Sequence, residues 1–267
     1  MIAEIVERVL QSWRYRDVDR SLLTRLAEEE LRRARNADDA VKRVKRRLHQ
    51  AVGAFRGASR PDALAAAWSG DLADPAFRQA CTHALRGHAS TRERIAHLEA
   101  FYGGIWSVTG VPNRVMDLGC GLNPLTLPWM GLAPDATYLA SDVDRRPLAA
   151  ASTFLDLVGQ PHRVETLDII ERLPTDAADV ALMLKLVTTL DRQNPGAATR
   201  LVSVLKTGHA VVSFPRQSLA GRGKGMERTY RTRLARLADD VGRVSSVAEA
   251  SISNELVFVL TLDPVDG

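Results

Sequence analysis

Residues 114–127, RVMDLGCGLNPLTL, decide the fold of this chain. A short apolar run ends in an acid and is closed by Gly-x-Gly, which predicts a buried parallel strand that turns sharply into a helix. Glycines in such a turn allow the main chain to approach a ligand closely. The stretch therefore predicts an α/β fold with a ligand site at a strand tip, and simple packing of a strand against a helix is the alternative.

Two features of this turn separate the ligand classes that use it. A dinucleotide-binding turn needs a third glycine, and this chain has Pro124 at that position. Asp117, two residues before Gly119, would repel a pyrophosphate and suits a cationic ligand better. The pattern that runs from Asp117 through Gly119 to Gly121 therefore favours S-adenosylmethionine.

Further acids follow the next two predicted strands. The stretch TYLASDVD predicts a strand that ends at Asp142, about 20 residues beyond the glycine turn, where a carboxylate can bind ribose hydroxyls. Asp144 is a candidate helix cap. In VETLDII, Asp168 falls at the tip of a third strand, where it could meet the adenine or its ribose. These positions favour a nucleoside-containing cofactor.

The composition bounds the class of protein. With 267 residues, 45% hydrophobic and 25% charged, the chain is expected to be globular and water-soluble. It contains neither a run long enough to span a membrane nor an apolar signal core, so we expect a cytoplasmic protein without a membrane partner. Cys81 and Cys120 form no CxxC pair, and the histidines are scattered, so we expect reduced thiols and no metal.

The hydrophobic pattern changes near residue 110, which predicts two domains. Residues 1–109 repeat apolar positions at helical spacing, so this part is expected to be an all-helical extension. Residues 110–267 alternate short apolar runs with helical segments, and the last two runs predict an antiparallel hairpin at the sheet edge. The predicted strands are 114–118, 137–141, 163–167, 179–184, 210–214, 247–252 and 255–262.

Positive charge gathers in the first part of the chain. Residues 1–109 hold 19 Lys or Arg against 14 Asp or Glu, whereas residues 110–267 hold 17 against 18. The excess of arginine over lysine suits phosphate recognition, although GC-rich coding produces the same bias. A solvated helix face is one interpretation of DDAVKRVKRRLHQAV, but a phosphate-binding patch fits its dense charge better. Its cations are Lys42, Arg43, Lys45, Arg46 and Arg47.

The stretch HASTRER, residues 88–94, precedes the sheet region. Ser90 and Glu93 match a capping box that would open a helix. Arg92 and Arg94 would lie in its first turn, where positive charge is unfavourable unless an anion is nearby. The methionine carboxylate of the cofactor is the candidate anion, and a pair of surface arginines is the alternative. The histidine of this stretch could be an ordinary loop residue.

Two later features suggest the acceptor side. Lys185 follows the fourth strand, where it could position a phosphate or a base, although a snorkelling lysine is the alternative. Residues 211–234 run from a strand into a loop rich in glycine and cations, which has the charge of an RNA-clamping segment. Phe214 and Met226 could supply apolar contacts to a base.

Several motifs occur in the order typical of one family: HASTRER, DLGCGLNPL, SDVD, LKL and SFPRQSLAGRGKGME. Over nearly its full length the sequence resembles the aminoglycoside-resistance 16S rRNA (guanine(1405)-N7) methyltransferases. The resemblance implies a Rossmann-like class I methyltransferase sheet of seven strands with the last antiparallel. It also implies methylation of a decoding-site guanine within the 30S ribosomal subunit. A methyltransferase for another base, such as a decoding-site adenine, and a non-catalytic ribosome assembly factor are the alternatives.

The motifs and the resemblance together give a map of expected sites. S-Adenosyl-L-methionine is the expected cofactor and S-adenosyl-L-homocysteine the product. Guanine N7 has a free lone pair, so we expect no catalytic acid or base, and we expect a monomer. The expected cofactor-binding residues are His88, Arg92, Arg94, Asp117, Gly119, Gly121, Asp142, Asp168 and Leu184. The expected RNA-binding residues are Lys42, Arg43, Arg46, Arg47, Lys185, Phe214, Arg222, Lys224 and Met226.

Overall fold

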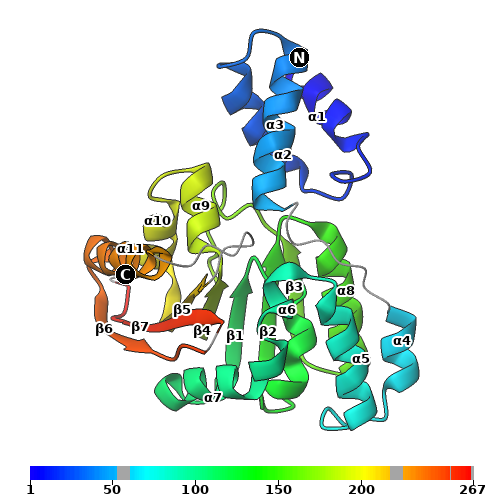
Figure 1. Ribbon diagram of the computed structural model, residues 1–267, viewed down its shortest axis with the longest axis vertical. Coiled ribbons are helices and arrows are strands. Elements are labelled where there is room, and N and C mark those ends of the chain that lie inside the picture. Colours follow the sequence, from blue (N-terminus) through cyan, green and yellow to red (C-terminus); the bar gives the residue numbers. More distant parts are fainter. Residues whose placement is uncertain (53–60, 217–224, 253, 266–267) are drawn as a thin grey trace.

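A seven-stranded sheet covered by helices on both faces forms the body of the protein, and three further helices stand at one end of it (Figure 1). The computed structural model describes residues 1–52, 61–216, 225–252 and 254–265. The described helices include none that is both long and apolar enough to cross a lipid bilayer.

The sheet has the order β3-β2-β1-β4-β5-β7-β6, in which β7 runs antiparallel to both of its neighbours. All seven predicted strands and the antiparallel hairpin are confirmed. The edge strand of the hairpin lies at Val244–Glu249, three residues earlier than the predicted 247–252. The strands are β1 (Arg114–Leu118), β2 (Thr137–Asp142), β3 (His162–Thr166), β4 (Ala177–Leu184), β5 (Lys206–Pro215), β6 (Val244–Glu249) and β7 (Glu255–Leu262).

Helices cover the two faces of the sheet because each face carries a separate set of apolar side chains. One face packs against α4 (Pro61–Ala67), α5 (Pro75–Arg86), α7 (Leu98–Thr109), α8 (Arg145–Val158) and the 3₁₀ segment η3 (Asn123–Trp129). The other face packs against α9 (Val187–Gln193), α10 (Ala197–Val204) and α11 (Met226–Val241). The short elements α6 (Ala89–Arg92) and η2 (Ile95–His97) connect α5 to α7.

The first three helices have a hydrophobic core of their own. They are α1 (Ile2–Leu10), α2 (Arg20–Leu31) and α3 (Ala37–Ala51), and their apolar stripes meet at fully buried residues such as Ile5, Leu26 and Val44. We call residues 1–52 the N-terminal unit and the described residues from 61 onward the sheet domain. The hydrophobic cores thus separate between Val52 and Leu64, whereas the predicted domain boundary is at residue 109.

Local sequence explains how α3 begins. Asn36 caps the helix, since its side-chain oxygen accepts a hydrogen bond from the backbone N–H of Asp39 at 2.9 Å. Asp38 and Asp39 lie in the first turn, where the helix dipole favours negative charge, as the sequence predicts. The cations that follow therefore lie on a well-formed helix.

Candidate functional site

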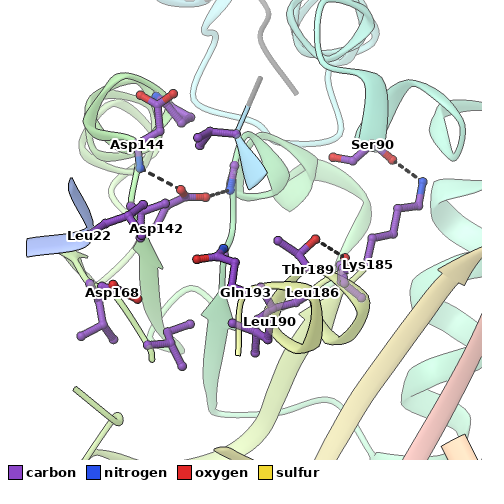
Figure 2. A pocket seen from close by; sticks show the side chains of 18 of the residues that line it. Leu22, Ser90, Asp142, Asp144, Asp168, Lys185, Leu186, Thr189, Leu190 and Gln193 are labelled. Carbon is purple, nitrogen blue, oxygen red and sulfur yellow. Dashed lines mark hydrogen bonds between the residues drawn. The ribbon is translucent and has the colours of Figure 1, made fainter. Parts of the chain in front are cut away.

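A cavity lies at the carboxyl edge of the sheet, where the parallel strands β1 to β4 end side by side (Figure 2). It encloses about 850 Å³ of empty space when its open mouth is included. Its lining includes these expected cofactor residues: His88, Gly119, Gly121, Asp142, Asp168 and Leu184. Lys185 lines it as well.

The glycine turn after β1 forms the floor of the cavity. Gly119 and Gly121 have φ of +64° and +51°, a left-handed conformation that side chains disfavour. A Cβ on Gly121 would lie 2.8 Å from Cε1 of His88, so the site also lacks room for one. The helix that follows is the 3₁₀ segment η3, in which the interior Pro128 supplies no backbone N–H for a helical hydrogen bond.

Asp142, at the tip of β2, presents its carboxylate to the cavity (Figure 2). One oxygen accepts from the N–H of Gly121 and the other from the N–H of Asp144, both at 2.9 Å. Burial raises the pKa of Asp142 to about 6, the charge of Asp144 adds to this, and the backbone hydrogen bonds oppose it. Asp144 caps α8 through the N–H of Arg146 at 3.1 Å, which confirms its predicted role.

Asp168 lies beyond β3 and is buried at the cavity wall. Its Oδ1 accepts from the backbone N–H of Ile170 at 3.1 Å. Its Oδ2 accepts from Nε of Arg25 at 2.8 Å, and this arginine belongs to α2 of the N-terminal unit. The acid that the sequence assigns to the cofactor is therefore fixed by a residue from the other part of the chain.

His88 closes the cavity on the side of α6. Burial lowers its pKa to about 4, and the charges of Arg94 and Lys185 lower it further, so the imidazole is neutral at pH 7. Its Nδ1 lies 2.9 Å from Oγ of Ser90. The predicted capping box is wrong, because α6 begins directly after His88 and the carboxylate of Glu93 contacts the ammonium of Lys185 instead.

Lys185 adopts a left-handed backbone conformation with φ of +58°, and among the described residues other than glycine no other does so. Its N–H donates to the carbonyl and the hydroxyl oxygens of Ser213, at 3.2 and 3.1 Å. Its Nζ donates to the carbonyl of Ser90 at 3.0 Å (Figure 2). It also lies 2.5 Å from Glu93 and 3.7 Å from Glu255. The ammonium thus points toward α6, and the carboxylates of Glu93 and Glu255 balance its positive charge.

A buried polar network lies behind the glycine turn. Arg94 donates to both carboxylate oxygens of Glu255, at 3.1 and 2.8 Å, and to Oδ1 of Asn123 at 3.0 Å. Asn123 and Tyr138 in turn donate to Asp117 at 2.9 and 2.6 Å. Burial raises the pKa of Asp117 to about 6 despite these hydrogen bonds. The network connects the turn after β1 to the beginning of β7.

Three of the expected cofactor-binding residues lie outside the cavity lining, two of them in this network. Arg94 and Asp117 are buried behind the cavity, and the cavity lining among the described residues includes neither of them. Arg92 is exposed and is likewise outside that lining. The structure therefore brings six of the nine expected cofactor residues together and places Arg92, Arg94 and Asp117 elsewhere.

The expected RNA-binding residues on α3 divide into two kinds. Lys42 and Arg46 are exposed, and within the described parts of the chain no ion pair involves them. Arg43 and Arg47 both pair with Glu30 of α2, at 3.8 and 3.2 Å. The unpaired cations are available to a polyanion, whereas the paired ones hold helices together.

Two further expected RNA-binding residues, Phe214 and Met226, belong to β5 and α11. Phe214 is fully buried and stacks on Tyr230 at a centroid distance of 4.8 Å, so its ring belongs to the core and is not offered to a base. Met226 is partly buried and is the first residue of α11. Arg222 and Lys224 lie outside the described residues.

Sequence reasoning missed several residues that shape the site. Arg25 lies inside an apolar stripe, where a cation is unusual, and Glu255 opens an otherwise apolar strand. Each anomaly indicates a buried ion pair, but neither names its partner. Asn123 and Gln193 have no such anomaly, since polar amides are ordinary near turns and helix ends.

The comparisons with known proteins agree with this geometry. Residues 11–259 match the model of the family described as ribosomal RNA methyltransferase (FmrO). The chain belongs to this family. A member from Frankia casuarinae, named 16S rRNA (guanine(1405)-N(7))-methyltransferase, is 40% identical over 97% of this chain and 93% of its own length. A Micromonospora echinospora member of the same name is 37% identical over 97% of this chain and 96% of its own length.

A solved structure from the same group of enzymes shares the whole architecture. The 16S rRNA methyltransferase RmtF, crystallised in complex with S-adenosyl-L-homocysteine, superimposes with a TM-score of 0.80 at 29% identity. The alignment covers 98% of both chains. The sheet and the N-terminal helices of this FmrO-family protein are therefore those of a class I methyltransferase with a helical extension.

Proposed function

We propose that this protein transfers the methyl group of S-adenosylmethionine to N7 of guanine 1405 in 16S rRNA, and that the assembled 30S subunit is its substrate. The observation that carries the proposal is the 40% identity, over nearly the whole chain, to a relative whose name states this reaction. The modified decoding site would then no longer bind certain aminoglycosides, and the protein would confer resistance to them.

The residues around the cavity fit this cofactor. The glycine turn leaves room for a ligand near the main chain, and the Asp142 carboxylate, held by two N–H groups, is suited to a ribose diol. Asp168 and the apolar side chains of Leu167 and Ile169 line the part of the cavity beside β3, where a purine would lie. We assign the ribose to Asp142 and the adenine edge to Asp168.

Catalysis of this reaction requires correct positioning of the two reactants more than it requires proton transfer. S-Adenosylmethionine, when bound, supplies an electrophilic methyl group. Guanine N7 attacks with its lone pair and has no proton to lose, so the lining residues need not include a general base. Correct orientation of the reacting atoms can contribute about 7–11 kcal/mol to catalysis. The neutral ring of His88 then forms part of the cavity wall, and Lys185 is held in place by its contacts with Ser90 and Glu93.

The charge distribution supports an RNA partner. Lys42 and Arg46 on α3 lie free of ion pairs among the described residues and can contact phosphates. Guanine N7 faces the deep major groove of an RNA helix, so the target base must be exposed or flipped, which costs a few kcal/mol. Basic contacts from the N-terminal unit would offset part of that cost.

The test of this proposal is the transfer of labelled methyl groups from S-adenosylmethionine to three substrates: intact 30S subunits, naked 16S rRNA and 50S subunits. We expect label in the 30S subunits only. Equal labelling of naked rRNA would contradict the assembled subunit as substrate. Absence of label from every substrate, with wild-type protein that binds S-adenosylhomocysteine, would contradict the proposed reaction.

A further inference from the structure

The N-terminal unit meets the sheet domain around the rim of the cofactor cavity. The N–H of Asp19 donates to the carbonyl of Val143 at 2.8 Å, and Val18 forms an isolated β-bridge with Asp144. Val143 and Asp144 both line the cavity. The loop that carries them directly follows Asp142, so the N-terminal unit holds the cavity's ribose side by main-chain contacts.

The side chain of Arg25 makes a second connection at the rim. Its Nε donates to Asp168 at 2.8 Å, and its Nη2 donates to Oε1 of Gln193 at 3.0 Å. Asp168 and Gln193 both line the cavity, one from the segment after β3 and the other from the end of α9 (Figure 2). Only 8% of the Arg25 side chain and 4% of that of Asp168 are exposed. One buried guanidinium thus joins two walls of the cavity.

The N-terminal unit also supplies part of the lining itself. Leu22, one turn before Arg25 on α2, and Val52, after the end of α3, both line the cavity. Arg47 reinforces the contact, since its Nη2 donates to the carbonyl of Gln193 at 2.8 Å. A ligand in the cavity would therefore touch both parts of the chain.

We propose that Arg25 is a positioning residue for cofactor binding, and that an occupied cavity stabilises the docking of the N-terminal unit on the sheet domain. The identity of the ligand rests on the proposed function. Arg25 fixes Oδ2 of Asp168 while the N–H of Ile170 fixes Oδ1. Without the guanidinium, a buried carboxylate would lose its counter-charge and its orientation. Any ligand that contacts both parts favours the docked arrangement.

Calorimetric titration with S-adenosylhomocysteine tests the role of Arg25. We expect Arg25→Ala to raise the Kd at least about tenfold, the factor that corresponds to about 1.4 kcal/mol. Arg25→Lys should also weaken binding, because an ammonium lacks the planar fork that reaches two partners at once. The matched control is Arg20→Ala on the same helix, whose side chain is exposed and pairs with Glu7 inside the N-terminal unit. Wild-type affinity in Arg25→Ala would overturn the proposal.

Hydrogen exchange of the wild-type protein tests the docking without any substitution. Added S-adenosylhomocysteine should slow exchange of the α2 amides around Arg25, and unchanged exchange there would overturn the proposed linkage. In methyl transfer to 30S subunits, Arg25→Ala should raise the KM for S-adenosylmethionine far more than it lowers kcat. Wild-type protein that fails to bind S-adenosylhomocysteine would refute the proposed function. Wild-type protein that binds it, with Arg25→Ala equally tight, would refute only this inference.

Discussion

The buried position of Asp142 disfavours the charged form of its carboxylate, and we therefore expect cofactor binding to depend on pH. Burial raises its pKa from 3.8 to about 6, so the carboxylate becomes protonated as pH falls through about 6. A protonated carboxyl accepts hydrogen bonds from a ribose diol less well. We predict that affinity for S-adenosylhomocysteine, measured by calorimetry, is constant above about pH 7 and falls several-fold by pH 5.

Asp142→Asn separates this effect from that of Asp117, whose pKa is also raised to about 6. We expect the variant to bind S-adenosylhomocysteine about ten- to a hundredfold more weakly at pH 7, the equivalent of a charged hydrogen bond worth about 1.5–3 kcal/mol. Its affinity should also change little between pH 5 and 7. A full pH dependence in the variant would assign the titration to another group and contradict the role of Asp142.

Gly121 can be tested against a glycine of similar conformation elsewhere. Gly121 and Gly131 both have left-handed φ, +51° and +65°, so alanine costs about 1–2 kcal/mol of strain at either position. Only at Gly121 would the new Cβ also collide with the His88 ring, because no atom lies within 4 Å at Gly131. We predict that Gly121→Ala lowers the affinity for S-adenosylhomocysteine more than tenfold. Gly131→Ala should lower Tm alone, and equal affinities in both variants would contradict this reading of the turn.

At the scale of elements, the beginning of β7 depends on one buried ion pair. Glu255 is fully buried and binds Arg94 through both oxygens, whereas Glu249 on the neighbouring strand pairs with Arg231 at the surface. We predict that Glu255→Ala lowers the free energy of unfolding by about 3–5 kcal/mol, since it leaves a buried charge unpaired. Glu249→Ala should lower it by about 0–1 kcal/mol. Urea unfolding measures both, and similar losses would contradict a structural role for the network.

Helix α3 combines the proposed RNA-binding cations with cations that make structural contacts. We predict that the double variant Lys42→Ala, Arg46→Ala binds 30S subunits more weakly and reduces the slope of log K against log salt concentration by about 2. Its Tm should stay near that of the wild type, because the described residues form no ion pair with either cation. Arg47→Ala should lower Tm instead, since Arg47 joins Glu29 and Gln193. An unchanged salt dependence in the double variant would place the RNA elsewhere.

The elements were more predictable than their contacts. A short apolar run in the sequence predicts each strand. Because parallel strands end at the same edge of a sheet, the positions of Asp142 and Asp168 could be predicted from the sequence. Arg25 and Asp168 are 143 residues apart, and Arg94 and Glu255 are 161 apart. Local patterns can indicate that a buried charge has a partner, but they do not identify which distant residue it is. The predicted capping box was wrong because Glu93 matches the sequence pattern but its carboxylate contacts Lys185.

At the scale of the whole molecule, the N-terminal unit has a hydrophobic core of its own, but its residues Leu22 and Val52 line the cavity. The basic helix α3 stands at the end of the molecule above the sheet (Figure 1). Val52, which follows the last residue of α3, lines the cavity. An RNA bound along α3 would therefore lie near the place where the reactive methyl group is expected. In the proposed function, the helical extension would thus bring bound RNA to the methyltransferase sheet, where one atom of the target base receives the methyl group.

The most direct measurement is chemical mapping of that atom. 16S rRNA from 30S subunits treated with the protein and S-adenosylmethionine is reduced with borohydride and cleaved with aniline, which cuts the chain at 7-methylguanine. We predict a single additional cut, at guanine 1405, that is absent when the cofactor is omitted. Methylated rRNA without any cut, or with its cut at a different guanine, would contradict the account.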